Sequence, residues 1–90
     1  MENLDSIFKA LSDPIRLQIL KKLYSEESVC VCNLVDMFDI SQSKLSYHLK
    51  MLLRENLINR TSHGKWNYYS VNKDRISRVL TYEVIQKLFL

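Results

Sequence analysis

A chain of 90 residues and 10.7 kDa has room for one small domain, because a second hydrophobic core needs a considerably longer chain. Hydrophobic residues make up 47% and charged residues 26%, with one Gly and one Pro, a composition that excludes disordered and collagen-like proteins. No apolar run is long enough to span a bilayer, and the N-terminus lacks the layout of a secretory signal. We therefore expect a single cytoplasmic domain over residues 1–90, without a membrane partner.

The positive charge is concentrated in the middle of the chain, although the net charge is only +3. Residues 1–40 carry four Lys or Arg against seven Asp or Glu, residues 41–68 carry five against one, and residues 69–90 carry four against two. A polyanion such as nucleic acid would therefore bind the middle of the chain. An ordinary solvated basic surface gives the same pattern.

Three helices are predicted before residue 40. The first has apolar residues at helical spacing: Leu4, Ile7, Phe8 and Leu11. Asp13 and Pro14 predict the N-cap and first position of the second helix, which runs to about Tyr24. Its expected inward residues are Ile15, Ile19, Leu20 and Leu23, and its expected outward residues are Arg16, Gln18, Lys21 and Lys22. A short third helix is predicted over residues 29–38.

A fourth helix is predicted over residues 42–55, with Ser41 as its N-cap. Its third position is Lys44, where Glu or Gln would complete a capping box, and a cation there opposes the helix dipole. Departures of this kind tend to fall at functional sites. A lysine beside free helical N–H groups suits an external phosphate.

A β-hairpin and a last helix complete the predicted elements. Residues 57–62 and 66–71 are rich in β-branched and aromatic residues, and a basic tip of His63, Gly64 and Lys65 separates them. Alternation along the second strand predicts that Tyr69 and Val71 face the core. Nine of the eighteen residues from 73 to 90 are apolar. This excess predicts a partner surface, most simply a second copy with two-fold symmetry.

The predicted fold is mainly α with a β-hairpin, in the order ααααββα, which describes a winged helix-turn-helix. In this fold the fourth helix enters the major groove of DNA and the hairpin flanks it. The start of that helix offers short, donor-rich side chains for bases and phosphates: Ser41, Gln42, Ser43, Lys44, Ser46 and Tyr47. Helix capping and solubility are the alternative reading of the serines. Basic residues extend the expected DNA surface: Lys50, Arg60, His63 and Lys65.

Four runs of the chain resemble the ArsR/SmtB family of metal-responsive transcriptional repressors: LSDPIRLQIL (11–20), CVCNL (30–34), SQSKLSYHL (41–49) and GKWNYY (64–69). The resemblance implies a homodimer, paired through its first and last helices, that leaves its operator when an effector binds. It also implies that Tyr47 and His48 touch double-stranded DNA, although packing between helices is an equal reading of His48. No cofactor is implied for DNA binding itself. The expected dimer residues are Leu4, Ile7, Phe8, Leu80, Val84 and Leu88.

Cys30 and Cys32 are too few for a disulfide scaffold and fit a reducing compartment. They resemble the site for arsenite and antimonite of the arsenical-responsive members, which have a third cysteine where this chain has Val35. Two thiolates also suit Cu(I), whereas tetrahedral Zn²⁺ needs two more donors.

The spacing of the two cysteines predicts how an effector would act. In a regular helix residues i and i+2 point about 200° apart, so joint binding by Cys30 and Cys32 requires the third helix to unwind or start later. Such a change would shift the fourth helix relative to the major groove and weaken DNA affinity. Alternatively, the cysteines are half-buried hydrophobes or thiols oxidised between protomers.

The sequence therefore predicts a homodimeric repressor that is released by arsenite, antimonite or another thiophilic ion at Cys30 and Cys32. One alternative is a winged-helix regulator controlled by thiol oxidation or by a partner protein. Another is a protein-interaction module that uses its last helix. The chain has no Gly-rich phosphate loop, no paired carboxylates in an apolar setting and no nucleophile with an evident base, so an enzyme is not expected.

Overall fold

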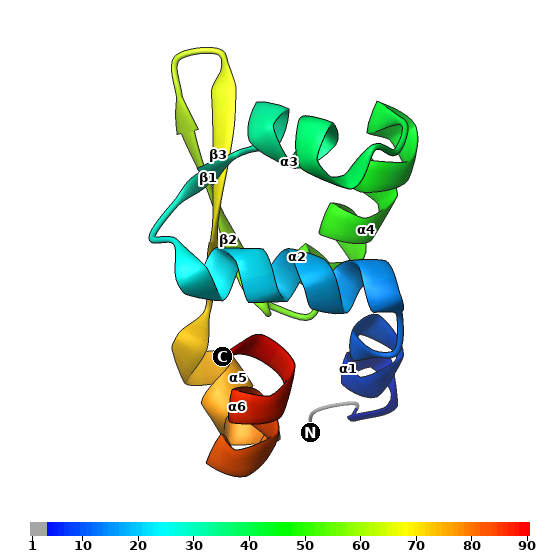
Figure 1. Cartoon of the computed structure of the whole chain (residues 1–90), viewed down its shortest axis with the longest axis vertical. Coiled ribbons are helices and arrows are strands. Elements are labelled where there is room, and N and C mark those ends of the chain that lie inside the picture. The colour runs from blue at the N-terminus through cyan, green and yellow to red at the C-terminus, as the bar shows by residue number, and fades with distance from the viewer. Residues whose placement is uncertain (1–3) are drawn as a thin grey trace.

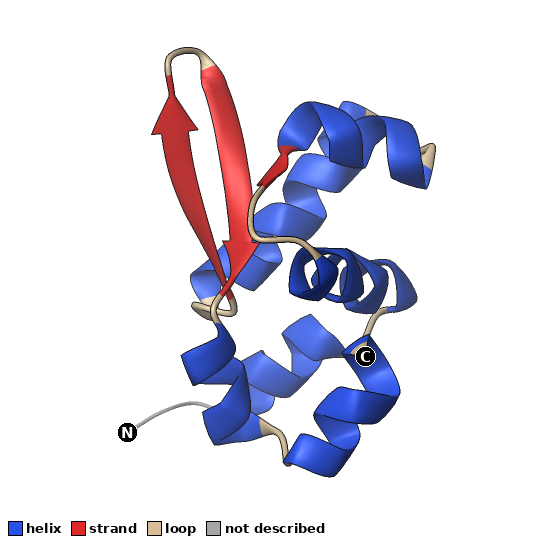
Figure 2. Ribbon diagram, turned by 60° about the vertical axis from the view of Figure 1, so that its left-hand side comes forward, coloured by secondary structure: helices blue, strands red, loops and turns tan. Residues whose placement is uncertain are grey.

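The computed structural model describes residues 4–90, which form a helical body and a protruding β-hairpin (Figures 1 and 2). The first three residues of the predicted domain lie outside the described part. The helices are α1 (Leu4–Leu11), α2 (Pro14–Ser25), α3 (Val31–Phe38), α4 (Gln42–Arg54), α5 (Lys73–Val79) and α6 (Tyr82–Phe89). The strands are β1 (Val29–Cys30), β2 (Ile58–His63) and β3 (Trp66–Val71). This arrangement confirms the predicted winged helix-turn-helix.

Helix α2 lies at the centre of the molecule and contacts α1, α4, α6 and β3 (Figure 1). Almost every element contributes a side chain that is excluded from water, so the chain has one continuous core. Tyr69 faces this core as predicted, and Val71 packs against it, partly buried. The fully buried side chains include Ile7, Leu20, Val29, Leu34, Leu52, Leu57 and Ile76.

Two of the predicted helix starts are confirmed by their caps. The Asp13 carboxylate accepts hydrogen bonds from the backbone N–H of Ile15 at 2.8 Å and of Arg16 at 3.2 Å, and Pro14 follows it at the first helical position. The Ser41 hydroxyl accepts from the backbone N–H of Lys44 at 3.1 Å. These caps fix where α2 and α4 begin.

The sheet has three antiparallel strands in the order β1-β3-β2, one more than the hairpin that the sequence predicts. Strand β1 pairs with the middle of β3 through Val29 opposite Tyr69 and Cys30 opposite Tyr68. Its two residues are too few to show an alternating pattern, which is why they read as the start of the third helix. The short strand joins the beginning of α3 to the wing, β2 and β3.

The predicted last helix over residues 73–90 is wrong in its continuity, because it consists of α5 and α6. Leu80 has extended backbone angles, and the Thr81 hydroxyl caps α6 by accepting from the backbone N–H of Val84 at 3.3 Å. The break turns α6 back against α2, where the rings of Phe89 and Tyr24 stack with centroids 5.0 Å apart. The fold order therefore departs from ααααββα at β1 and at this break.

Candidate nucleic-acid interface and cysteine pair

The first half of α4 presents a polar face to solvent, while Leu45, Leu49 and Leu52 anchor the helix in the core. Of the side chains predicted to contact DNA from this helix and its cap, His48 is buried and the others are exposed. The exposed ones are Ser41, Gln42, Ser43, Lys44, Ser46, Tyr47 and Lys50. Buried positions recur every three or four residues, so the exposed ones gather on the opposite side. The helix is therefore held rigidly by one face and free on the other.

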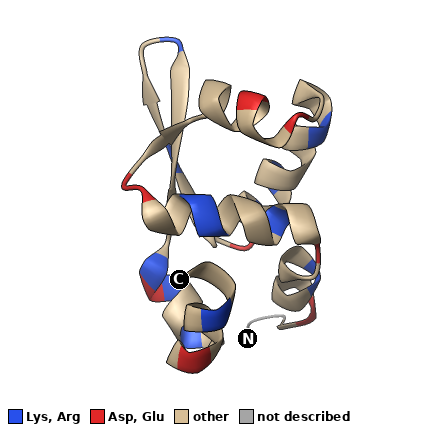
Figure 3. Cartoon of the chain, in the orientation of Figure 1, with Lys and Arg blue, Asp and Glu red and all other residues tan. Residues whose placement is uncertain are grey.

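The wing presents the second group of predicted contacts. Arg60, His63 and Lys65 are all exposed, and Gly64 turns the tip with a positive φ of 64°. The tip of the wing and the start of α4 lie at the same end of the molecule, and basic residues occur in both (Figure 3). The same end of the molecule also carries acidic residues. Asp36 lies in the last turn of α3, and Asp39 lies in the turn between α3 and α4.

His48 is not on the exposed face of α4, which corrects its assignment as a DNA contact. Its side chain is 6% exposed, and its Nδ1 lies 3.0 Å from Nη1 of Arg16. Arg16 is likewise 7% exposed, although the sequence predicts it on the outer side of α2. Hydropathy periodicity places a charged residue outside, and no signal on α2 alone shows that its partners lie on α1 and α4.

The apolar residues expected at a dimer interface divide into two groups. Leu4 and Phe8 of α1 are 52% and 50% exposed, and Val84 of α6 is exposed as well. Ile7 is fully buried in the protomer, so its assignment as a dimer residue is wrong. Leu80 and Leu88 are partly buried against the core. Helices α1 and α6 lie at the opposite end of the molecule from the tip of the wing (Figure 1).

Cys30 and Cys32 are joined by a disulfide, and their Cα atoms are 5.3 Å apart. Helix α3 starts at Val31, so Cys30 precedes the helix as its N-cap and its Sγ accepts from the backbone N–H of Cys32 at 3.4 Å. The sequence predicts that the two sulfurs can meet only if the third helix unwinds or starts later. The structure shows the second case, because α3 starts at Val31 and not at residue 29. Cys30 is buried and Cys32 is exposed.

A cavity of about 300 Å³ opens beside Cys32 at the junction of α3, α4 and the wing. Val35 lies one helical turn after Cys32 and lines the same cavity. Within residues 4–90, no cluster of three or more His, Cys, Asp or Glu side chains is arranged to hold a metal ion. The cysteine pair therefore offers two sulfur donors. The cavity is lined by Val31, Cys32, Val35, Asp36, Gln42 and Trp66, of which sequence reasoning missed Asp36 and Trp66 as neighbours of the pair.

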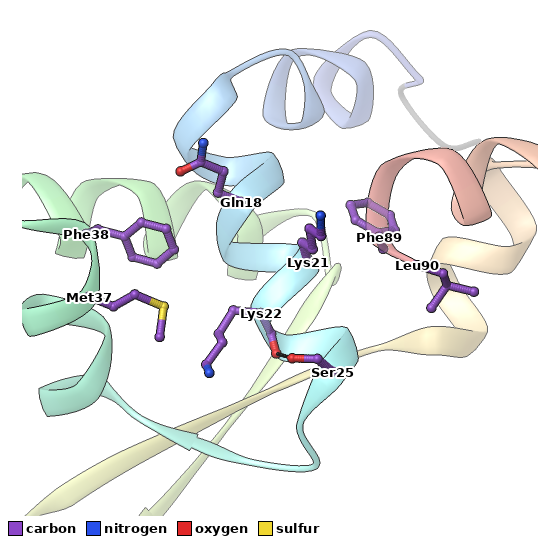
Figure 4. Close-up of a pocket in the computed structure, with 8 residues that line it drawn as sticks. All are labelled: Gln18, Lys21, Lys22, Ser25, Met37, Phe38, Phe89 and Leu90. Carbon is purple, nitrogen blue, oxygen red and sulfur yellow. Dashed lines mark hydrogen bonds between the residues drawn. The ribbon is translucent and has the colours of Figure 1, made fainter.

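A larger cavity of about 570 Å³ lies on another side of the molecule, between α2, the end of α3 and the end of α6 (Figure 4). Its apolar lining comes from Met37, Phe38, Phe89 and Leu90, and α2 contributes the polar residues Gln18, Lys21, Lys22 and Ser25. Lys22 is already paired with Glu26, at 2.6 Å between Nζ and Oε1. None of the predicted site residues lines this cavity.

Comparison with known proteins identifies the family. Residues 13–60 match the family described as bacterial regulatory protein, arsR family. The chain is 46% identical over 77 residues to an arsenical resistance operon repressor of Bacillus subtilis (strain 168), a match that covers 86% of this chain and 73% of that protein. No helix of the described part is long and apolar enough to cross a membrane.

Solved structures agree with this match. HlyU from Vibrio cholerae N16961 superposes with a TM-score of 0.77 at 28% identity, covering 99% of this chain and 98% of that chain. A homodimeric winged helix-turn-helix DNA-binding domain from Mycobacterium bovis has the same fold, with a TM-score of 0.78 at 22% identity over 93% of this chain and 78% of that chain. The chain thus belongs to the ArsR family of DNA-binding transcriptional regulators, which are not enzymes.

Proposed function

We propose that this protein is a homodimeric repressor that binds operator DNA through α4 and the wing. A thiophilic ion such as arsenite or antimonite, bound at Cys30 and Cys32, releases it. The observation that carries the proposal is the position of the cysteine pair, which lies where β1 meets α3 and so adjoins both DNA-binding elements. The similar repressor of Bacillus subtilis supports an arsenical effector.

The exposed polar face of α4 supports the DNA-binding part of the proposal. Gln42 and Ser43 are side chains that hydrogen-bond base edges, whereas Lys44 and Lys50 suit phosphates. The wing adds Arg60 from β2 and the basic tip, and the tip lies at the same end of the molecule as the start of α4. Neutralising phosphates at both places would make DNA affinity fall steeply with salt.

The exposed apolar residues of α1 and α6 support a dimer. Half-exposed Leu4 and Phe8 cost free energy in water, and a two-fold axis lets the same face cover itself in a second copy. In this arrangement both recognition helices face one side and read successive major grooves, about 34 Å apart. A single protomer offers only half of that surface.

Exchange of Phe8 for Glu tests the dimer. Because the axis places Phe8 in the interface twice, we expect the free energy of dimerisation to weaken by about 2 kcal/mol for each copy. Sedimentation analysis measures the change, with Lys9→Glu as the neighbouring control on the exposed side of α1. A Phe8→Glu protein that dimerises like the wild type contradicts the proposed interface.

The two reduced cysteines fit a soft ion. Thiolates are the preferred ligands of soft ions, and the two sulfurs of this pair already lie side by side. On binding, arsenous acid would exchange two of its hydroxyl groups for the two sulfurs, and these groups would leave as water with the two thiol protons. It would keep its third hydroxyl group or exchange it for a small thiol. The cavity beside Cys32 provides the room. The closed disulfide must be reduced before either sulfur can bind.

A change at the cysteine pair reaches both DNA-binding elements over short paths. Cys30 pairs with Tyr68 in β3, so the wing is attached directly to it. Cys32 lies in the first turn of α3, and Gln42 and Trp66 line the same cavity from α4 and the wing. Rearrangement of this first turn would therefore shift the wing relative to α4, which lowers DNA affinity if both contact the operator together.

The Val35→Cys variant tests the effector site. It supplies a third sulfur one helical turn from Cys32, inside the same cavity, so we expect the arsenite concentration that releases half of the DNA to fall by about tenfold or more. Val35→Ser is the matched control, because it introduces a small polar side chain that binds arsenite poorly. Equal sensitivity of wild type and Val35→Cys would place the arsenite site elsewhere.

The disulfide favours a second candidate function, release by thiol oxidation. Hydrogen peroxide would take two electrons from the two thiols and form the S–S bond, and its two oxygens would leave as two water molecules that carry the two thiol protons. DNA-bound protein kept reduced with a phosphine distinguishes the candidates, because a phosphine does not compete for arsenite as a thiol does. Release by hydrogen peroxide that fresh phosphine reverses, without release by arsenite, would favour oxidation.

A further inference from the structure

Arg16 connects three helices through a buried guanidinium group. Its Nε donates to the carbonyl oxygen of Ala10 at 2.6 Å, and its Nη2 donates to that of Lys9 at 3.0 Å. Both carbonyls belong to the last turn of α1. The Lys9 carbonyl also accepts from the backbone N–H of Ser12 at 3.3 Å, whereas Pro14, four residues after Ala10, has no N–H to offer the Ala10 carbonyl. The positive charge also complements the negative end of the α1 dipole. Arg16 of α2 therefore caps the C-terminal end of α1.

The same guanidinium group holds α4 through His48. Its Nη1 lies 3.0 Å from Nδ1 of His48, and since a guanidinium group only donates, Nδ1 must accept. The imidazole is therefore neutral, with its proton on Nε2. Each of the three guanidinium nitrogens of Arg16 has a partner, and within residues 4–90 no fully buried side-chain nitrogen or oxygen lacks one.

The surroundings of His48 favour its neutral form. Burial lowers the pKa of His48, the positive charges of Arg16 and Lys44 lower it further, and Asp13 opposes them. The Asp13 carboxylate lies near the same guanidinium nitrogen that faces His48, with Oδ2 4.0 Å from Nη1. These are the charged groups from α2 and α4 that face the ring, and α1 contributes uncharged backbone carbonyls.

We propose that Arg16 and His48 are positioning residues, which fix the DNA-recognition helix α4 relative to the dimer helix α1. This rests on the proposed function, in which α4 contacts DNA and α1 contacts the second protomer. The distance between the two recognition helices of the dimer then depends on the Arg16–His48 hydrogen bond in each protomer. Neither side chain needs to touch the DNA.

A pH dependence of unusual sign follows. Protonation of a histidine ordinarily strengthens binding to a polyanion, because it adds a positive charge. Protonation of His48 instead removes the acceptor and places two positive charges against each other. The free energy of unfolding should depend on pH in the same direction. Because the pKa of His48 is lower in the folded state, the Arg16–His48 hydrogen bond contributes its full stability above pH 6.5, and this contribution is lost as the pH falls below that value.

Two substitutions of His48 separate positioning from packing. His48→Leu keeps an apolar side chain of similar size but removes the acceptor. His48→Asn keeps an oxygen acceptor near the place of Nδ1 and cannot be protonated in this range. Fluorescence anisotropy measures the affinity of both variants and the wild type for DNA from upstream of the protein's own gene, at pH 7.5 and pH 5.0. Circular dichroism and sedimentation verify folding and dimerisation.

We expect His48→Leu to bind DNA about tenfold more weakly than the wild type at pH 7.5 while remaining dimeric, and His48→Asn to bind within about twofold. The ratio of wild-type to His48→Asn affinity should fall about tenfold between pH 7.5 and 5.0, and this ratio cancels the contributions of all groups that the two proteins share. Should His48→Leu fail to fold, the pH dependence of the ratio decides. The positioning role is overturned if the ratio of wild-type to His48→Asn affinity does not change with pH, or if folded His48→Leu binds DNA as tightly as the wild type. Either result leaves the proposed function standing. Failure of the wild type to bind at low salt overturns the proposed function as well.

Discussion

Replacement of Lys44 by Glu is expected to weaken operator binding by about 100-fold, which corresponds to about 1.4 kcal/mol in each of the two protomers. The exposed lysine at the start of α4 would be exchanged for a carboxylate that repels the phosphates. The same change should stabilise the folded protein slightly. Glu three residues after Ser41 completes a capping box and complements the helix dipole, a gain of about 0.5 kcal/mol or more.

The opposite signs of the two effects make this prediction specific. Anisotropy titrations measure the affinity, and thermal unfolding measures the stability. Arg78→Glu is the matched control, because it makes the same change in net charge on α5, where the exposed Arg78 pairs with exposed Asp74 at 3.2 Å. Loss of affinity in both variants would show a general effect of charge, and full affinity of Lys44→Glu would remove α4 from the DNA interface.

Replacement of Cys30 and Cys32 by Ser together is expected to abolish release by arsenite and leave DNA binding within about twofold of the wild type. Serine is a favoured N-cap, so Cys30→Ser should keep the cap that Cys30 now provides to α3. Cys32 is exposed, and its exchange costs little packing. Without thiolates the site has no soft ligand left.

The anisotropy assay follows release from labelled DNA during a titration with arsenite. For the wild type we expect saturating arsenite to lower the DNA affinity by about 100-fold. This loss lies near the upper end of the typical allosteric coupling free energy of about 1–3 kcal/mol. Each single serine variant should lose most of this response, since one sulfur cannot chelate the ion. Release of the doubly substituted protein at the wild-type arsenite concentration would contradict the proposed site.

The sequence predicts those parts of the fold that local patterns encode. Asp13 with Pro14, and Ser41, mark helix starts that the structure confirms, because a cap is a contact within four residues. The hairpin is found from its apolar strands and Gly64. The break at Leu80 is missed because apolar spacing continues across it, and the fold of α6 onto α2 depends on the contact between Phe89 and Tyr24.

The candidate site was predictable in its exposed part and not in its buried part. The polar face of α4 follows from a helical period alone. The roles of Arg16 and His48 do not, since each is polar and each pairs with a residue 32 positions away in the chain. The neighbours of Cys32 gather from α3, α4 and β3, and such a cavity exists only after the tertiary fold is formed.

The most direct measurement of the central claim is the anisotropy of labelled DNA from upstream of the protein's own gene, titrated with phosphine-reduced protein, with and without arsenite. We predict tight, salt-dependent binding that arsenite abolishes in the wild type and leaves intact when Cys30 and Cys32 are both replaced by Ser. Tight binding that arsenite leaves unchanged in the wild type would contradict release by a metalloid at these two cysteines.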